Sequence, residues 1–268
     1  GGGGWARGPT PRRGAAALGG FVLTPPAVMN ALNTRMRAEI LDAVGNASEA
    51  ARVLVMTGAG RAFCSGQDLQ EVQARYTGGA DVKLDFAAHL RHKYNPIVSR
   101  LRSIEKPVVA AVNGVAAGAG ASFAFACDLR IAARSASFVM SFVNVGLVPD
   151  SAATITLVQL VGAGRAAELC MLGEKLSAEQ AREWGLVNRV VDDEALPAEA
   201  ERLAVRLASL PTRAIGLTKR ALAHAWTTTL DDQLEYEAFL QQTAGETSDH
   251  RENVAAFIEQ RKPAFRGQ

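Results

Sequence analysis

The chain has 268 residues, of which 48% are hydrophobic and 21% charged, and its formal net charge is +2. These values are ordinary for a globular protein with one large domain, or one domain and an appendage. The charges form no long run of one sign, which argues against a nucleic-acid surface and a polybasic membrane patch. No apolar run in the sequence approaches the roughly 20 residues that spanning a bilayer requires. We therefore expect a cytoplasmic protein with neither nucleic-acid nor membrane partners.

Three scattered cysteines, Cys64, Cys127 and Cys170, form no C-x-x-C pair. Two of them lie in apolar stretches, so we predict buried thiols and neither disulfides nor a zinc site. His89 and His92 share one face of a predicted helix, but no third ligand is close in sequence. That pair indicates a solvated helix face, and the sequence predicts no metal site.

Residues 1–20 are atypical, because they begin with four glycines and show no periodicity. Their apolar stretch is too short for a secretory signal. We interpret them as an atypical or disordered segment, an expression remnant or the product of a mis-assigned gene start. A short strand is predicted to follow at 21–23, and Pro25-Pro26 ends it.

The stretch from 21 to 195 alternates short apolar strands with loops and helices, the pattern of an α/β core. The predicted strands are 21–23, 53–56, 107–112, 129–132 and 187–191. The predicted helices are 29–44, 84–104 with a restart at Pro96, 121–127, 151–161, 165–172 and 177–184. The polar stretch 70–83 is expected to be a mobile loop.

The stretch from 196 to 268 is predicted to be entirely helical. Its predicted helices are 197–209, 212–226, 230–244 and 248–260. They carry apolar stripes that must pack on the core or on another subunit. We therefore divide the chain into a core over 21–195 and a helical oligomerisation region over 196–268.

A glycine turn follows the predicted strand at 53–56. Within Ala59 to Leu69, Gly66-Gln67 offers backbone N–H groups just beyond a strand end. Asp68 is predicted to cap the segment that starts at Leu69. Cys64-Ser65-Gly66 resembles a nucleophile elbow only superficially. A plain turn stays the alternative to a donor site here.

A second glycine turn, Gly118-Ala119-Gly120, joins the strand at 107–112 to the helix at 121–127. The first N–H groups of a helix have no intrahelical partner, and with the positive end of the dipole they favour an anion. That anion is either a phosphate or the oxyanion of an enolised carbonyl. The turn is neither a G-x-G-x-x-G nor a P-loop, so a purely structural turn stays open.

Asp150 follows Pro149 about thirty residues after the second turn. A carboxylate near a donor-rich turn is a candidate for proton transfer. After a proline, however, an aspartate is more often a turn former or a helix N-cap. Two donor turns and one carboxylate are together what enolate chemistry on a thioester needs, because that chemistry holds an oxyanion and moves a proton.

Two long segments resemble known signatures. Residues 59–69, AGRAFCSGQDL, resemble the first signature of the crotonase (enoyl-CoA hydratase/isomerase) superfamily, and residues 106–133 resemble the second. The likeness extends from Leu32 to the C-terminus. It implies an α/β fold with a spiral core of ββα turns. It also implies that the C-terminal helices form a trimerisation region, in a homotrimer or a dimer of trimers.

The resemblance also implies a substrate and a site. The substrate would be an acyl-CoA, whose coenzyme A belongs to the substrate, so no separate cofactor is expected. The backbone N–H groups of Gln67 and Ala119 would form an oxyanion hole, and Asp150 would be the catalytic carboxylate. The implied substrate-binding residues are Gly66, Asp68, Gly118 and Phe142.

Hydratases of this family use two glutamates, and the matching positions hold Ser122 and Phe142. Neither side chain can activate and deliver water, so the resemblance implies an isomerase. Further segments, 94–96, 132–136, 138–140 and 176–181, resemble the family's isomerases of phenylacetate catabolism. Those enzymes convert ring-epoxidised phenylacetyl-CoA to the oxepin form and move a β,γ double bond into conjugation. A hydratase, decarboxylase or hydrolase on the same fold stays open, as does a non-catalytic thioester-binding homologue.

Two departures from the family pattern concern the site. The strands and Arg-Pro that usually precede Asn30 are replaced by Gly-rich sequence and Pro25-Pro26, in a region that helps to bind the adenine end of coenzyme A. After Asp150 the family usually has glycines, whereas this chain has Ser151-Ala152-Ala153. We expect the pKa of Asp150 to be raised through desolvation. The apolar neighbours expected to cause it are Phe142, Val145, Leu147 and Val148.

Overall fold

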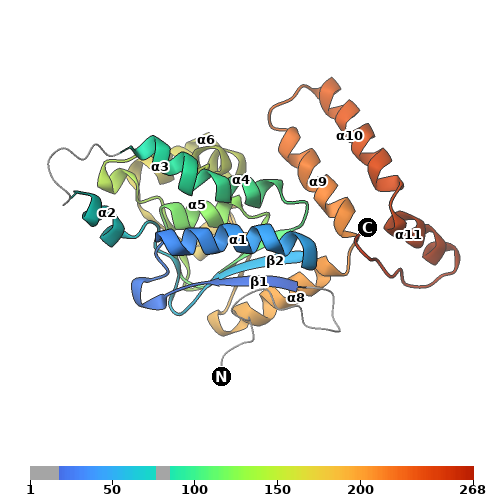
Figure 1. Ribbon diagram of the computed structural model, residues 1–268, viewed down its shortest axis with the longest axis horizontal. Coiled ribbons are helices and arrows are strands. Elements are labelled where there is room, and N and C mark those ends of the chain that lie inside the picture. The colour runs from blue at the N-terminus through green and yellow to red at the C-terminus, as the bar shows by residue number, and fades with distance from the viewer. Residues whose placement is uncertain (1–17, 77–84) are drawn as a thin grey trace.

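The computed structural model describes residues 18–76 and 85–268, and its strands form two sheets (Figure 1). The five-stranded sheet has the order β1 (Leu18–Leu23), β2 (Val53–Gly58), β4 (Val108–Val112), β6 (Leu129–Ala133) and β9 (Arg189–Val191). The four-stranded sheet has the order β3 (Ala62–Cys64), β5 (Val115–Ala117), β7 (Ser137–Val139) and β8 (Lys175–Ser177). All neighbours are parallel except β7 and β8.

From β2 to β7, consecutive strands alternate between the two sheets. β2, β4 and β6 lie in the five-stranded sheet, and each is followed directly by a strand of the other sheet, after which helical structure returns the chain. This repeated ββα turn is the predicted spiral, so the predicted fold class is confirmed. The central strand β4 is buried at all five residues, as its unbroken apolar sequence predicts.

Helices cover the sheets on different sides. The first helices are α1 (Thr34–Ala50), α2 (Leu69–Tyr76), α3 (Phe86–Lys93), α4 (Asn95–Ser103) and α5 (Ala119–Ala126). They are followed by α6 (Ala153–Leu172), α7 (Ala178–Glu183) and α8 (Leu196–Ala208). α8 packs across β1, β2, β4 and β6. Its buried alanines, Ala200, Ala204 and Ala208, allow a close approach to the sheet.

Near the N-terminus, the predicted strand at 21–23 is confirmed and is longer than predicted. β1 starts at Leu18 and pairs in parallel with β2, so residues 18–20 of the supposed atypical segment belong to the sheet. Residues 1–17 lie outside the described part of the chain.

Two predictions before the Gly118 turn need correction. The helix predicted at 29–44 starts at Thr34, because Met29 and Asn30 have φ of 51° and 56° and Asn33 accepts a hydrogen bond from the N–H of Met36 (2.8 Å). Residues 70–76, predicted as loop, lie in α2, while 77–83 lie outside the described residues. The predicted Asp68 cap is confirmed, since its Oδ1 accepts from the N–H of Gln70 (2.9 Å).

The helix predicted at 84–104 restarts as expected at Pro96, which lies in the first turn of α4. The predicted cap at Ser177 is also confirmed, because its hydroxyl accepts from the N–H of Gln180 (3.2 Å).

Among the described residues, α6 is the one helix long and apolar enough to span a bilayer by length and composition. Gly162 has non-helical angles (φ 77°, ψ 165°) and divides it into two segments, close to the two helices that the sequence predicts. Neither segment alone reaches the roughly 20 residues of a membrane span.

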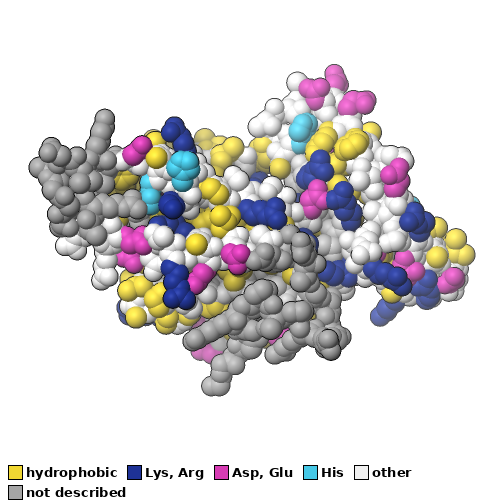
Figure 2. All heavy atoms as spheres, viewed as in Figure 1, with side chains coloured by type: hydrophobic (Ala, Val, Ile, Leu, Met, Phe, Trp, Pro, Cys, Tyr) yellow, Lys and Arg dark blue, Asp and Glu magenta, His cyan; other side chains and the backbone are white. Residues whose placement is uncertain are grey.

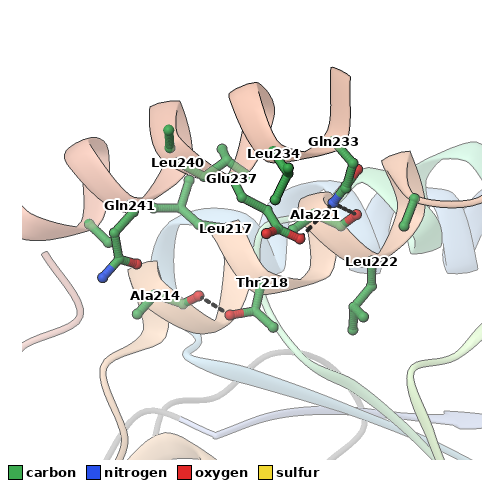
Figure 3. Close-up of a pocket in the computed structure, with 13 residues that line it drawn as sticks. Ala214, Leu217, Thr218, Ala221, Leu222, Gln233, Leu234, Glu237, Leu240 and Gln241 are labelled. Carbon is green, nitrogen blue, oxygen red and sulfur yellow. Dashed lines mark hydrogen bonds between the residues drawn. The ribbon is translucent and has the colours of Figure 1, made fainter. Parts of the chain in front are cut away.

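Three C-terminal helices project from the core in Figure 1: α9 (Thr212–His224), α10 (Leu230–Gly245) and α11 (Ser248–Ile258). Polar contacts fasten α9 to the core, since Lys219 donates to Asp128 (2.8 Å) and to the carbonyl oxygen of Leu101 (2.7 Å). A groove of about 650 Å³ runs between α9 and α10, and Figure 3 shows Leu234 and Leu217 on its walls. Figure 2 shows apolar side chains gathered at this groove and at the end of α11. None of the predicted site residues lines the groove.

Candidate active site

The Gly118 turn (residues 117–120) presents a backbone N–H at the start of a buried helix. Gly118 adopts φ 50° just before α5, and all eight residues of α5 are buried. The Gly118 N–H is bound to the carbonyl oxygen of Val139 (2.9 Å). Ala119 is the first helical residue, and no acceptor in the described part of the chain receives its N–H. The burial and the helix dipole make this N–H a donor suited to an oxyanion.

The Gly66 turn (residues 64–68) is held from both sides by Leu32. The N–H of Leu32 donates to the carbonyl oxygen of Gly66 (2.7 Å), and the N–H of Asp68 donates to the carbonyl oxygen of Leu32 (3.4 Å). Gln67 lies between these two bonds, and across residues 18–76 and 85–268 its N–H meets no protein acceptor. The turn therefore offers a second backbone donor in a fixed position.

The two turns touch through their glycines. A Cβ placed on Gly66, which has φ 92°, would lie 2.9 Å from the carbonyl oxygen of Ala117 and 3.7 Å from the nitrogen of Ala119. A Cβ on Gly120 would lie 2.7 Å from the Sγ of Cys64. Only glycine allows this approach, which brings the residues predicted for the oxyanion hole together.

Phe142 and Ser122 flank the Gly118 turn. A Cβ on Gly118 would lie 3.9 Å from the Cζ of Phe142, which places the predicted substrate-binding residues Gly118 and Phe142 side by side. Ser122 is fully buried, and its hydroxyl donates to the carbonyl oxygen of Gly118 (3.2 Å). The two positions that correspond to the hydratase glutamates thus hold a buried ring and an internally bonded hydroxyl.

Asp150 lies partly buried in the segment that enters α6. Burial raises the pKa of its carboxyl group, and a hydrogen bond from the hydroxyl of Ser151 to Oδ1 (2.8 Å) acts in the opposite direction. The raised pKa agrees with the prediction. Of the two structural alternatives for Asp150, the helix cap is wrong, because α6 begins at Ala153 with no side-chain cap. The turn is present, because the N–H of Ala153 donates to the carbonyl oxygen of Asp150 (3.0 Å).

The neighbours expected to desolvate Asp150 behave differently from one another. Phe142 is buried, but Val145 and Val148 are 65% and 79% exposed, and Leu147 is also exposed. These three side chains therefore face solvent in the single chain, whereas Phe142 does not. Tyr94, by contrast, is buried, and the charge of Asp150 helps to raise its pKa to about 12, after the larger effect of desolvation. Asp150 and Tyr94 are thus electrostatic neighbours.

Arg37 joins these parts, and sequence reasoning did not identify it. Its guanidinium is buried and donates to the carbonyl oxygen of Leu32 and to the hydroxyl of Tyr94 (3.3 Å), and it forms an ion pair with Glu71 (3.0 Å). It also lies 5.2 Å from the centre of the Tyr94 ring. Arg37 therefore links Leu32, which holds the Gly66 turn, to Tyr94, which lies near Asp150. Its place seven residues before Val44, on the apolar face of the predicted helix, was the available signal.

Alternative chemistry finds less support in the described residues. The thiol of Cys64 is buried, and desolvation raises its pKa to about 12, which disfavours a thiolate nucleophile. No group of three or more His, Cys, Asp or Glu in the described ranges could hold a metal ion. His89, considered above as part of a metal pair, lies instead with its Nε2 3.4 Å from the side-chain nitrogen of Gln67.

Known proteins resemble this chain over nearly its whole length. The enoyl-CoA hydratase/isomerase family model matches residues 14–268. The 1,2-epoxyphenylacetyl-CoA isomerase of Escherichia coli K12 is 46% identical over 92% of this chain and 94% of its own length. The crotonyl-CoA hydratase of Syntrophomonas wolfei is 35% identical over 90% of this chain and 91% of its own. The crystal structure of an enoyl-CoA hydratase from Polaromonas sp. JS666 matches with a TM-score of 0.85 and 35% identity, over 92% of this chain and 95% of the other. The chain belongs to the enoyl-CoA hydratase/isomerase, or crotonase, family.

Proposed function

We propose that the protein is an acyl-CoA isomerase that uses one carboxylate base and a backbone oxyanion hole. The observation that supports this most directly is that Asp150 is partly buried, while Ser122 and Phe142 stand where a pair of glutamates would be needed to add water. Enzymes of this family act on acyl-CoA substrates, so the oxyanion would be that of a thioester.

In the proposed reaction, the thioester oxygen accepts hydrogen bonds from the N–H groups of Gln67 and Ala119. Asp150 removes a proton from the carbon next to the thioester, and the electron pair of that C–H bond forms the enolate. For a β,γ-unsaturated substrate, Asp150 returns the same proton to the γ-carbon. The double bond is then conjugated with the thioester, and no atom is gained or lost.

The substrate that we favour is a ring-epoxidised phenylacetyl-CoA, converted to its oxepin form. The support is the 46% identity to a relative named 1,2-epoxyphenylacetyl-CoA isomerase. The same first proton transfer applies. The C–C bond that the epoxide shares with the six-membered ring breaks to give the seven-membered oxepin ring, and Asp150 returns the proton to a ring carbon, so the product is an isomer of the substrate. Gly66, Asp68, Gly118 and Phe142 would line the acyl site.

We further propose a homotrimer or dimer of trimers in the cytoplasm, with no cofactor beyond the coenzyme A of the substrate. The exposed apolar side chains of α9 to α11, such as Leu222, Phe239 and Phe257, support an oligomer, because they lack a covering surface within the described chain. Sedimentation would measure the assembly directly.

Hydration is the second candidate, because relatives such as the crotonyl-CoA hydratase carry that name. Ser122 and Phe142 disfavour it, since neither side chain carries a carboxylate that could accept a proton from water and return it.

The test is a spectroscopic assay of the purified protein with a β,γ-unsaturated acyl-CoA, beside Asp150→Asn and the exposed control Asp231→Asn. We expect conjugation with the wild type and the control, and at least about 10³-fold less with Asp150→Asn. Activity that survives in Asp150→Asn would refute the mechanism. Addition of water to crotonyl-CoA at a comparable rate would instead favour the hydratase.

A further inference from the structure

We propose that Ser151 is a positioning residue for the base: its hydroxyl holds Oδ1 of Asp150 and leaves Oδ2 to exchange the proton with the substrate. The inference deepens the proposed function and rests on it. It arises from a hydrogen bond between neighbouring side chains at the point where this chain departs from the glycines of its family.

The hydrogen bond is direct and sheltered. The Oγ of Ser151 lies 2.8 Å from Oδ1 of Asp150, and Ser151 is 4% exposed. Within the described residues, no donor reaches Oδ2 of Asp150. A hydroxyl bound to an ionised carboxylate makes one of the stronger hydrogen bonds in proteins and fixes the rotation of the carboxylate. One oxygen is therefore occupied, and the other is available.

The backbone is held in an unfavourable conformation to make this contact. Ser151 and Ala152 have φ of 55° and 64°, two consecutive left-handed residues without glycine. Such a residue is strained and persists only when its surroundings fix it. A bond from the N–H of Ala153 to the carbonyl oxygen of Asp150 (3.0 Å) closes the turn. Glycine would fit both left-handed positions without strain but would provide no hydroxyl.

The hydroxyl of Ser151 does not form a hydrogen bond to the start of α6. Ser151 lies one residue before Ala152, the N-cap position of α6, where its hydroxyl could still turn toward the helix; yet the first turn of α6 has no side-chain cap, and the hydroxyl donates to Asp150. The hydroxyl therefore serves the carboxylate and not the helix.

The charge of Asp150 also acts on Tyr94, at the start of α4, and, after the larger effect of desolvation, helps to raise its pKa. The guanidinium of Arg37 in α1 donates a hydrogen bond to the hydroxyl of Tyr94. The buried tyrosine stays neutral over the working pH range, because its pKa is about 12. Within the described part of the chain, the hydroxyl of Ser151 is the hydrogen-bond donor to the charged form of Asp150. It offsets part of the desolvation that favours the neutral acid.

The experiment measures the pH dependence of kcat/KM for conjugation of a β,γ-unsaturated acyl-CoA with Ser151→Ala and Ser151→Gly. Both variants lose the hydroxyl, and Ser151→Gly also removes the left-handed strain, so a defect that both share is not due to that strain. The control is Ala152→Gly, which relieves the same kind of strain and keeps the hydroxyl.

We expect the acid limb of the profile to move to higher pH in both Ser151 variants and to stay in place in Ala152→Gly. On that limb, kcat/KM should fall about tenfold, the effect of one lost charge-assisted hydrogen bond, with KM little changed. A merely structural role would change stability without moving the limb.

Two results would overturn the inference, and they differ. If Asp150→Asn is inactive but both Ser151 variants keep the wild-type limb, the positioning role is wrong and the proposed function stands. If Asp150→Asn keeps its activity, the base itself is wrong and both proposals fail.

Discussion

Gly66 and Ala117 are in direct backbone contact, because the position of a Gly66 Cβ lies 2.9 Å from the carbonyl oxygen of Ala117. This contact joins two turns that are about fifty residues apart in the chain, and each turn supplies one N–H of the candidate oxyanion hole. The distance between these two donors therefore depends on the absence of a side chain at position 66.

The first prediction concerns Gly66→Ala. The added methyl group must push the turns apart and occupy a backbone with φ 92°, so we expect kcat to fall about 10²-fold. The free energy of unfolding should fall by about 1 to 3 kcal/mol. Steady-state kinetics and urea unfolding measure these effects.

The matched control is Gly45→Ala, in an open position of α1. It should keep full activity and stabilise the fold by about 0.5 to 1 kcal/mol, because alanine is the better helix former. An active Gly66→Ala enzyme would show that the contact does not fix the donors.

A second prediction follows from the raised pKa of Asp150, which burial causes. A carboxyl group with a raised pKa binds its proton more tightly in the folded than in the unfolded state. Its contribution to stability is therefore complete at low pH and is lost as the pH rises through the folded pKa. At neutral pH, Asp150→Asn should raise the melting temperature while it abolishes activity.

The same linkage predicts that this gain in melting temperature disappears when the pH falls below the usual range of an aspartate. Thermal unfolding of the wild type and Asp150→Asn across pH tests it. An unchanged or lower melting temperature at neutral pH would show that the carboxylate is not destabilised by burial.

A third prediction concerns Arg37→Met. The change leaves the carbonyl oxygen of Leu32 and the carboxylate of Glu71 without their donor, so the protein should lose about 3 kcal/mol of stability. We also expect a fall in kcat, since the Gly66 turn loses its support. Arg35→Met, two residues earlier on the exposed face of α1, should change stability by less than about 0.5 kcal/mol. Equal effects of the two substitutions would contradict the role of Arg37.

A fourth prediction concerns the attachment of α9. Lys219→Met leaves the largely buried Asp128 without its cationic partner and should destabilise the protein by about 3 kcal/mol. Because desolvation already raises the pKa of Asp128, Asp128→Asn together with Lys219→Met should recover part of that loss. Additive losses in urea unfolding would refute the coupling.

The sequence predicts the architecture well where one signal dominates. The unbroken apolar run at 108–112 is a buried strand, and Pro96 restarts a helix as expected. The alternation of strands with helices, together with the two signatures, predicts the spiral. Each of these signals is local in the chain, so no tertiary contact is needed to interpret it.

The parts that were missed depend on contacts between distant residues. The start of α1 at Thr34 follows from the left-handed Asn30, whose amide donates to the carbonyl oxygens of Ala59 (2.9 Å) and Ala62 (2.8 Å). Arg37 is buried because Leu32, Tyr94 and Glu71 surround its guanidinium. The hydroxyl of Ser151 binds Asp150 only because the backbone turns left-handed there, which no propensity predicts for serine and alanine.

The residues of the candidate site could be chosen from the sequence, but the contacts that hold them in place could not. The two turns and Asp150 could be chosen from residue types and the family likeness. The sequence could not show that glycines at 66 and 120 bring the turns into contact, since this depends on how close β3 and β5 lie.

The order of the five-stranded sheet has a consequence for synthesis on the ribosome. The strands stand in the same order as in the chain, β1, β2, β4, β6 and β9, so each new strand can add to the edge formed by the one before it. The helix that covers these strands, α8, ends 75 residues after β6 does. Because the ribosome adds about 5 to 20 residues per second, one apolar face of the nascent sheet stays uncovered for roughly 4 to 15 seconds. During that interval the growing chain is a candidate for chaperone binding, whereas in the finished chain α8 covers the same surface, with Leu196 and three alanines buried.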